Sequence, residues 1–112
     1  MKKVEAIFRH IKLEEVKKAL DKIDVRGITV TEAKGAGKQR GYTETYRGSQ
    51  LIINLRPKVK LETVITDELV DRVVDTIMDI ARTGAIGDGK IFVSPIEEAI
   101  AIRTGIRGDK AC

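Results

Sequence analysis

Cysteine, histidine and tryptophan are nearly absent from this chain of 112 residues. The only cysteine is Cys112, the only histidine is His10, and there is no tryptophan. A single cysteine excludes an intramolecular disulfide and a cysteine-based metal cluster, and it favours a reducing compartment. A single histidine without a nucleophile motif beside it argues against a Ser-His-Asp enzyme, so we interpret His10 as a strand-end or surface residue.

Long apolar runs and aromatic side chains are also scarce. No segment has the length and apolarity of a transmembrane helix, and the first residues lack a secretory signal pattern, so we expect a cytoplasmic protein. Aromatic residues make up only 4% of the chain, which leaves few platforms for stacking nucleic-acid bases. The formal net charge of +4 indicates an anionic partner without identifying it.

The chain does have the composition of one globular domain, residues 1–112. Hydrophobic residues make up 42% and charged residues 34% of it. A chain of this length buries roughly two-thirds of its unfolded surface, which is enough for one core.

Apolar spacing predicts four strands and two helices. In the first strand Val4, Ala6 and Phe8 alternate with charged neighbours, which indicates one buried face. Strands are predicted at residues 2–9, 28–33, 59–65 and 90–94, and helices at 13–23 and 66–82. We expect Pro57 to interrupt the chain before the third strand and Gly84 to end the second helix. Residues 96–102 read as a turn with a small strand, and residues 105–112 as a loose, flexible tail.

This order, βαββαβ, predicts an α+β fold: a ferredoxin-like split βαβ sandwich with both helices on one sheet face. The other face is expected to carry apolar side chains without a helix to cover them. An uncovered apolar face favours a homo-oligomer that packs its sheet faces inward. The alternative is a two-layer monomer whose outer face is partly polar.

Residues 34–50 show neither helical nor strand periodicity. The stretch combines glycines with cations: Gly35, Gly37, Gly41, Gly48, Lys34, Lys38, Arg40 and Arg47. A segment of this length without structure is usually functional or disordered. Residues 51–55 are apolar again and read as a strand-like return arm.

A glycine-rich turn precedes the last predicted strand, in the sequence Thr83-Gly84-Ala85-Ile86-Gly87-Asp88-Gly89-Lys90-Ile91-Phe92-Val93. Residues 84–90 match the G-x-x-x-x-G-K pattern of a P-loop. However, Ile91 replaces the magnesium-binding hydroxyl, and the loop runs from helix to strand instead of from strand to helix. We therefore reject a P-loop NTPase and retain a backbone cradle for phosphate. A helix C-cap at Gly84 followed by a hairpin-like turn remains open as the alternative.

Two segments together resemble the PII signal-transduction family of trimeric nitrogen-status sensors. They are residues 83–93 and the segment Gly35-Ala36-Gly37-Lys38-Gln39-Arg40-Gly41, which leads into Thr43-Glu44-Thr45-Tyr46-Arg47-Gly48. The resemblance extends from residue 1 to about residue 104. It implies a homotrimer with a long T-loop, at about residues 36–55, that docks onto target proteins.

The resemblance implies a nucleotide site for ATP or ADP in the cleft between neighbouring subunits. By this likeness, the adenine lies at Thr29 and Val64, and Arg103 reaches the phosphates from the adjacent chain. The phosphates are held by the glycine turn and closed over by the base of the T-loop: Gly87, Asp88, Gly89, Lys90, Gly35, Gly37, Lys38 and Gln39. Charge-assisted hydrogen bonds of this kind are each worth roughly 1.5–3 kcal/mol.

An effector site for 2-oxoglutarate is implied beside it. Gln39 would ligate a Mg²⁺ ion shared by ATP and 2-oxoglutarate, Lys58 would pair with a carboxylate, and Gly37 and Gly41 would complete the pocket. A magnesium ion with oxygen ligands would screen the repulsion between a triphosphate and a dicarboxylate. Without the resemblance, we would interpret Lys58 and Lys90 as solvated surface charges.

The implied partner is an ammonium transporter, contacted through Tyr46, Arg47 and Gly48, so that the protein is cytoplasmic and peripherally membrane-associated when bound. The guanidinium of Arg47 is suited to plugging a pore, although it also reads as a solvated loop cation. A nitrogen-assimilation enzyme such as glutamine synthetase is the alternative target. Leu51 replaces the tyrosine that relatives modify, so no modification is expected there, and Ala101 replaces a second phosphate-facing arginine.

Two functions of other classes remain as rivals. An RNA-binding ferredoxin-like module would need aromatic side chains in place of Val4, Ala6 and Ile91, so we expect no nucleic-acid partner. A slow ATPase could use Glu44, Glu62 or Asp88 to orient water, but no paired acid and base are recognisable, so we expect no enzyme. The chain is therefore interpreted as a sensor in which bound ligands determine the conformation of the T-loop.

Overall fold

The computed structural model describes residues 1–35, 42–46, 49–53 and 55–112. Within 42–46 and 49–53 it describes the backbone alone. Six residues of the predicted sites lie outside the described residues: Gly37, Lys38, Gln39, Gly41, Arg47 and Gly48.

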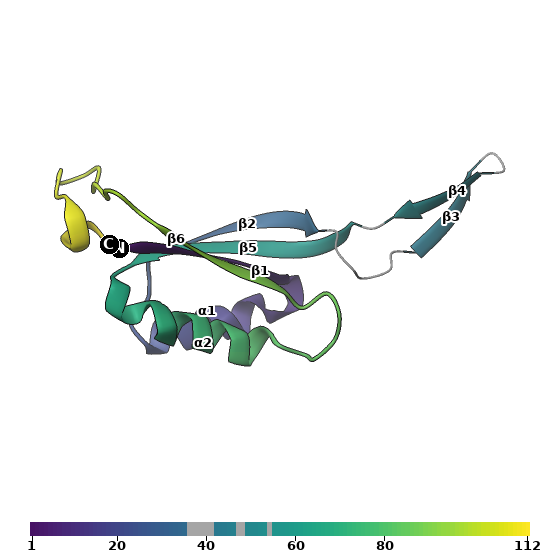
Figure 1. Cartoon of the computed structure of the whole chain (residues 1–112), viewed down its shortest axis with the longest axis horizontal. Helices are drawn as coiled ribbons and strands as arrows, with labels where there is room; N and C mark the ends of the chain where they lie inside the picture. The colour runs from purple at the N-terminus through teal and green to yellow at the C-terminus, as the bar shows by residue number, and fades with distance from the viewer. Residues whose placement is uncertain (36–41, 47–48, 54) are drawn as a thin grey trace.

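Four antiparallel strands form one sheet in the order β2-β5-β1-β6 (Figure 1). The strands are β1 (Lys2–Arg9), β2 (Ile28–Gly35), β5 (Arg56–Ile65) and β6 (Gly89–Pro95). Helices α1 (Leu13–Lys22) and α2 (Val70–Ala81) lie side by side on one face of this sheet. The α+β, ferredoxin-like βαββαβ arrangement predicted from the sequence is confirmed.

The core lies between that face and the two helices. Val4, Ala6 and Phe8 of β1 are buried there, as their alternation predicts. The other buried apolar residues come from β5, from both helices and from the α1–β2 turn: Val16, Leu20, Val25, Val59, Leu61, Ile65, Val73, Ile77 and Ala81. Full burial of a side chain of this size contributes about 1.5–3 kcal/mol, so this layer fixes the sheet on the helices.

The opposite, helix-free face is not the apolar surface that the sequence led us to expect. The strand register places Glu5 across from Glu62 on this face, with Lys60 two positions along β5. Lys60 lies 3.8 Å from a carboxylate oxygen of each glutamate, and these side chains are half-buried. Ion pairs therefore occupy the middle of the face, and Phe92, which is 52% exposed, lies beside them across from Glu5. The prediction of an uncovered apolar face is therefore wrong. The helix-free face is partly polar, as in the alternative prediction.

The same register corrects one step of the argument against RNA binding. Val4 and Ile91 lie on the helix-covered face with Ala6, so aromatic residues at these positions would be hidden from a base. Among the described residues, Phe92 is the aromatic side chain of the four-stranded sheet that lies on the open face.

Two element boundaries differ from the prediction for local reasons. β5 runs through Pro57, which pairs with Lys34 of β2. Because β1 ends at the Arg9–Lys58 pair, β5 has a neighbour on one side only at Pro57, and an edge tolerates the missing N–H. α2 ends at Ala81 and Arg82 is already extended, so Gly84 lies within the loop and does not cap the helix.

Residues 34–53 contain more structure than the sequence predicted. β2 and β5 stay paired beyond the end of β1, as far as Gly35 and Arg56. Past them, β3 (Tyr42–Tyr46) pairs with β4 (Ser49–Ile53) in an antiparallel hairpin, which Figure 1 shows beyond the end of the four-stranded sheet. Residues 51–53 of the predicted return arm are confirmed as strand, within β4, and Leu55 lies outside it. The sequence of β3 has no apolar alternation from which a strand could have been predicted.

The C-terminal segment folds back beside the N-terminus, at the end of the sheet opposite the hairpin (Figure 1). Instead of a small strand, residues 96–107 contain one isolated bridge, between Ile100 and Arg107. Residues 108–111 form a 3₁₀ turn (η3), held by a hydrogen bond from the Gly108 N–H to the Ala99 carbonyl at 3.0 Å. Where the sequence predicts a loose tail, the backbone therefore has a defined shape.

None of the helices in the described part of the chain has the length and apolar character needed to cross a membrane. Short 3₁₀ turns precede the two helices, at His10–Lys12 (η1) and Asp67–Leu69 (η2).

The close approach of β6 to β1 predicts that Gly89→Ala destabilises the fold. Gly89 has a φ of +109°, and a Cβ there would lie 1.8 Å from the carbonyl oxygen of Ile7. We expect the substitution to lower the free energy of unfolding by at least about 2 kcal/mol, measured by urea denaturation.

Gly27→Ala is the matched control, because a Cβ at Gly27 meets nothing within 4 Å. It should change the stability by less than about 1 kcal/mol. Equal urea midpoints for the two variants would contradict the close packing of Gly89 against Ile7.

Candidate functional site

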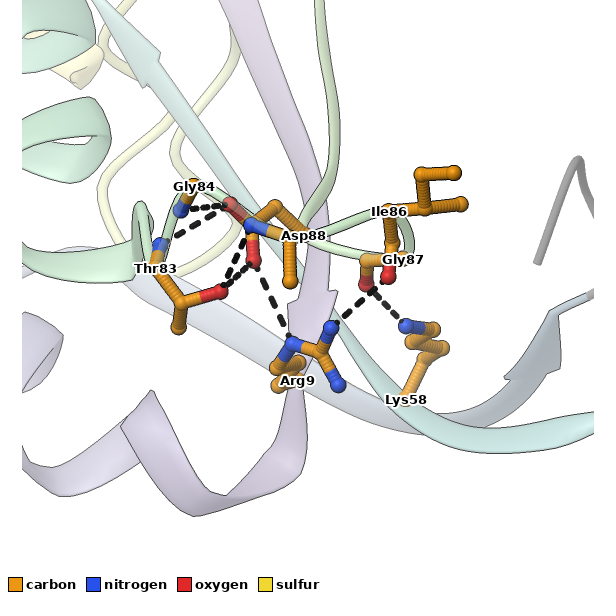
Figure 2. A network of polar contacts seen from close by, with 8 residues as sticks. Arg9, Lys58, Thr83, Gly84, Ile86, Gly87 and Asp88 are labelled. Carbon is orange, nitrogen blue, oxygen red and sulfur yellow. Dashed lines mark hydrogen bonds and ion pairs between the residues drawn. The ribbon is translucent and has the colours of Figure 1, made fainter.

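The glycine turn between α2 and β6 passes close to the ends of β1 and β5 (Figure 2). It follows a helix and precedes a strand, as predicted, so its direction is opposite to that of a P-loop. Gly87 has a φ of +100° and Gly89 a φ of +109°, which L-residues with a Cβ rarely adopt. These two glycines therefore allow a backbone conformation that is unfavourable for residues with a Cβ.

The carboxylate of Asp88 organises the first half of the turn. It accepts hydrogen bonds from the main-chain N–H of Thr83 at 2.8 Å and of Gly84 at 2.9 Å, and from the Thr83 hydroxyl. Arg9 Nε donates to it at 3.3 Å. The Thr83 hydroxyl above all, with these N–H groups and Arg9, holds the pKa of Asp88 well below its usual range. Asp88 is therefore a stably charged anchor of the turn.

Two cations hold the second half of the turn. Arg9 Nη2 donates to the Ile86 carbonyl at 2.9 Å, and Lys58 Nζ donates to the Gly87 carbonyl (Figure 2). Burial, with the neighbouring charge of Arg9, lowers the pKa of Lys58, which is only 8% exposed. Lys58 is thus a buried structural cation in this state and not the solvated surface charge that the sequence alone allowed.

Arg9 was missing from the site residues predicted from the sequence. Strand alternation does place it on the helix-free face, because it is one position beyond the buried Phe8. Its partner Asp88 is 79 residues away, so no local pattern links the two. The contact follows from the pairing of β6 with β1, which brings Gly89 opposite Phe8.

Several predicted phosphate and effector residues do meet at this end of the sheet. Lys58 Cγ lies 3.2 Å from where a Cβ of Gly35 would be, and Lys58 itself reaches Gly87. Asp88, Gly89 and Lys90 line a cavity of about 370 Å³ together with α2. Lys58 therefore joins the base of the arm to the glycine turn, whereas the cavity lies against α2 and its lining residues do not include Gly35 or Lys58. Lys90, at the start of β6, is exposed.

The predicted adenine residues lie at the other end. Val64 pairs with Lys3, whereas Gly89 pairs with Phe8, five positions further along β1, which is roughly 17 Å. Thr29 and Val64 line a second cavity, of about 470 Å³, to which the C-terminal residues Asp109, Ala111 and Cys112 contribute. Within one chain, the adenine and phosphate residues are thus separated along the sheet.

Arg103 is separated from the glycine turn as well. It is an exposed residue of the C-terminal segment, which follows the end of β6 that pairs with Lys2. The chain therefore does not bring its own Arg103 to its own Gly87–Lys90 turn.

The magnesium ligand predicted from the sequence, Gln39, lies outside the described residues. No group of three or more His, Cys, Asp or Glu residues suited to a metal ion occurs in the part of the chain that the structure describes.

Comparison with known proteins places the chain among named regulators. The family model "Nitrogen regulatory protein P-II" matches residues 1–106. Proteins of that name from Rhodospirillum rubrum and Azospirillum brasilense are 60% and 55% identical to it over 111 residues, which cover 99% of each chain. The protein of that name from Bradyrhizobium diazoefficiens is 60% identical over 108 residues, or 96% of each chain.

The depressed pKa of Asp88 predicts a pH dependence of stability. Its folded pKa lies below the unfolded value of 3.8, so its stabilising contribution is present above about pH 4 and is lost as the pH falls further. Wild type should therefore lose more stability between about pH 5 and about pH 3 than Asp88→Asn, in urea titrations at fixed pH.

Asp75→Asn, which removes an exposed carboxylate from α2, is the control and should retain the wild-type pH profile. Parallel profiles for wild type and Asp88→Asn would show that the carboxylate does not anchor the turn.

Proposed function

The chain belongs to the nitrogen regulatory protein P-II family, and from this premise we propose that it senses ATP, ADP and 2-oxoglutarate and reports them through its T-loop. The observation that carries the proposal is the cationic glycine turn at the base of the β2–β5 arm. Ligands bound at this turn would act on the strands that lead into residues 36–55 through Lys58 of β5, which donates to the Gly87 carbonyl. The protein is proposed to act by binding, since its relatives are named as regulators.

The phosphates of ATP or ADP are assigned to the glycine turn. Gly87 and Gly89 offer main-chain N–H groups, and Lys90 offers an exposed ammonium. Asp88 contributes through its main-chain N–H, because its carboxylate is already engaged and would repel a phosphate. The assignments of Gly35, Gly37, Lys38 and Gln39 to the phosphates, and of Thr29 and Val64 to the adenine, are retained from the family resemblance.

The site is proposed to lie between the subunits of a homotrimer. Arg103 and the glycine turn occupy opposite ends of one chain, so an Arg103 that contacts the phosphates has to come from a neighbour. Three equivalent sites would follow from cyclic symmetry. Because residue 101 is alanine, the arginines of residues 96–107 are Arg103 and Arg107. The guanidinium of Arg107 is paired with Glu98, so Arg103 is the one assigned to the phosphates.

The effector 2-oxoglutarate is assigned to Lys58, Gly37, Gln39 and Gly41, with Mg²⁺ on Gln39. Lys58 joins the arm to the turn, because it lies beside Gly35 and donates to Gly87. A carboxylate that binds Lys58 would compete with or share this hydrogen bond. Ligand binding in the pocket would therefore affect both the arm and the glycine turn. Each ligand can shift the T-loop only by its difference in affinity for the two loop conformations.

The proposed target is an ammonium transporter, met through Tyr46, Arg47 and Gly48 on the T-loop of a cytoplasmic protein. This choice rests on the resemblance of the loop sequence, and a nitrogen-assimilation enzyme such as glutamine synthetase is the second candidate. Leu51 has no hydroxyl, so ligand occupancy alone would set the state of the loop at this position.

Calorimetric titration tests the ligand scheme. ATP and ADP should each bind, and 2-oxoglutarate should bind only after MgATP, because Mg²⁺ has to screen the repulsion between the two anions. Binding of 2-oxoglutarate with equal affinity in the absence of MgATP would contradict the scheme. ATP hydrolysis that persists through purification and is lost in Lys90→Ala would instead favour an ATPase.

Mixed trimers test the location between subunits. Lys90→Ala and Arg103→Ala homotrimers should each bind ATP weakly. In any trimer that mixes the two variants, one junction joins an intact Lys90 to an intact Arg103, so random mixing should restore about a quarter of the sites. A site built within one chain would give no restoration on mixing, as measured by ATP stoichiometry.

A further inference from the structure

Two consecutive carbonyl groups of the glycine turn point at two cations. The Ile86 carbonyl accepts from Arg9 and the Gly87 carbonyl accepts from Lys58. Figure 2 shows both contacts on the same side of the turn. Successive carbonyl groups of an extended chain point to opposite sides, so this arrangement needs an unusual backbone at Gly87, and its φ of +100° supplies it.

The sheet register brings the two cations together. Arg9 is the last residue of β1 and pairs directly with Lys58 of β5, so their side chains leave the same face as neighbours. Like charges opposite one another in an antiparallel pair are destabilising. The carbonyl oxygens of Ile86 and Gly87 and the Asp88 carboxylate offset this repulsion, and the pair in turn fixes where those oxygens lie.

The position of the carbonyls sets the direction of the N–H groups. The peptide bonds here are trans, so the N–H of Gly87 points away from the Ile86 carbonyl and the N–H of Asp88 away from the Gly87 carbonyl. Two successive N–H groups then face one side, which is the geometry of an anion-binding nest. Within the part of the chain that the structure describes, neither N–H donates to a protein acceptor.

We propose that Arg9 is a positioning residue for the phosphate site: together with Lys58 it holds the Ile86 and Gly87 carbonyls and so aims the Gly87 and Asp88 N–H groups at the nucleotide phosphates. The inference rests on the proposed function for the identity of the anion. The contacts by which Arg9 and Lys58 hold the turn are made within the protein and involve no ligand.

The shape of the guanidinium is essential to this role. Arg9 donates to two different groups at once, from Nε to Asp88 at 3.3 Å and from Nη2 to Ile86 at 2.9 Å. A planar fork spans two such acceptors, whereas an ammonium is a single point of charge. Arg9→Lys keeps the positive charge but cannot donate to both groups in the same geometry. It therefore distinguishes the positioning of the turn from the electrostatic attraction of a phosphate.

The test compares Arg9→Lys and Arg9→Met with Arg72→Met, which removes one positive charge from an exposed position of α2. The first readout, without ligand, is the set of residual dipolar couplings of the amide N–H bonds. Both Arg9 variants should change the couplings of Gly87 and Asp88 and leave those of β1 and α2 unchanged, a pattern that general loss of stability would not produce.

The second readout is the dissociation constant for ATP from calorimetry. It should rise at least about tenfold in both Arg9 variants, since each loses charge-assisted hydrogen bonds that order the site, and by less than about twofold in Arg72→Met. Wild-type couplings in Arg9→Lys would overturn the positioning of the turn by Arg9. Changed couplings with unchanged ATP affinity would overturn the link to phosphate.

These outcomes differ from failure of the proposed function. If wild type itself does not bind ATP, the nucleotide assignment is wrong, while the ligand-free couplings still decide whether Arg9 and Lys58 shape the turn.

Discussion

The contact between the Arg9–Lys58 pair and the glycine turn is the interaction on which the candidate site depends. Three oxygen acceptors of the turn meet two cations there, and one of the cations is buried. Without those oxygens, two like charges would face each other at the end of a strand pair. Without the cations, a turn with three glycines at positive φ, Gly84, Gly87 and Gly89, would lose the contacts that hold its second half. Each part therefore stabilises the other, and together they define one surface at the base of the arm.

The sheet determines that this contact forms. Antiparallel pairing of β1 with both β5 and β6 brings Arg9, Lys58 and Gly89 to the same end, although they are far apart in the sequence. The same β5 continues beyond β1 with β2 toward the hairpin. A change at the turn can therefore act on the arm through Lys58 and Gly35, which is the route the proposed signalling requires.

Local pattern was enough to predict the fold, because its strands and helices show clear periodicity, as in the alternation of Val4, Ala6 and Phe8. It failed where the decisive fact was a pairing between distant segments. Pro57 could be accommodated only because β1 ends beside it, and the helix-free face is charged because Glu5, Lys60 and Glu62 meet across strands. The glycine turn was recognised from its composition, but the role of Arg9 depends on a partner 79 residues away.

The central claim is that the amides of the glycine turn bind phosphate. The most direct measurement is a titration of the ¹⁵N-labelled protein with MgATP, followed by the amide chemical shifts of residues 83–95. The account predicts that the Gly87, Asp88 and Gly89 signals shift most and in proportion to occupancy. Saturation with MgATP that leaves these three signals in place would contradict it.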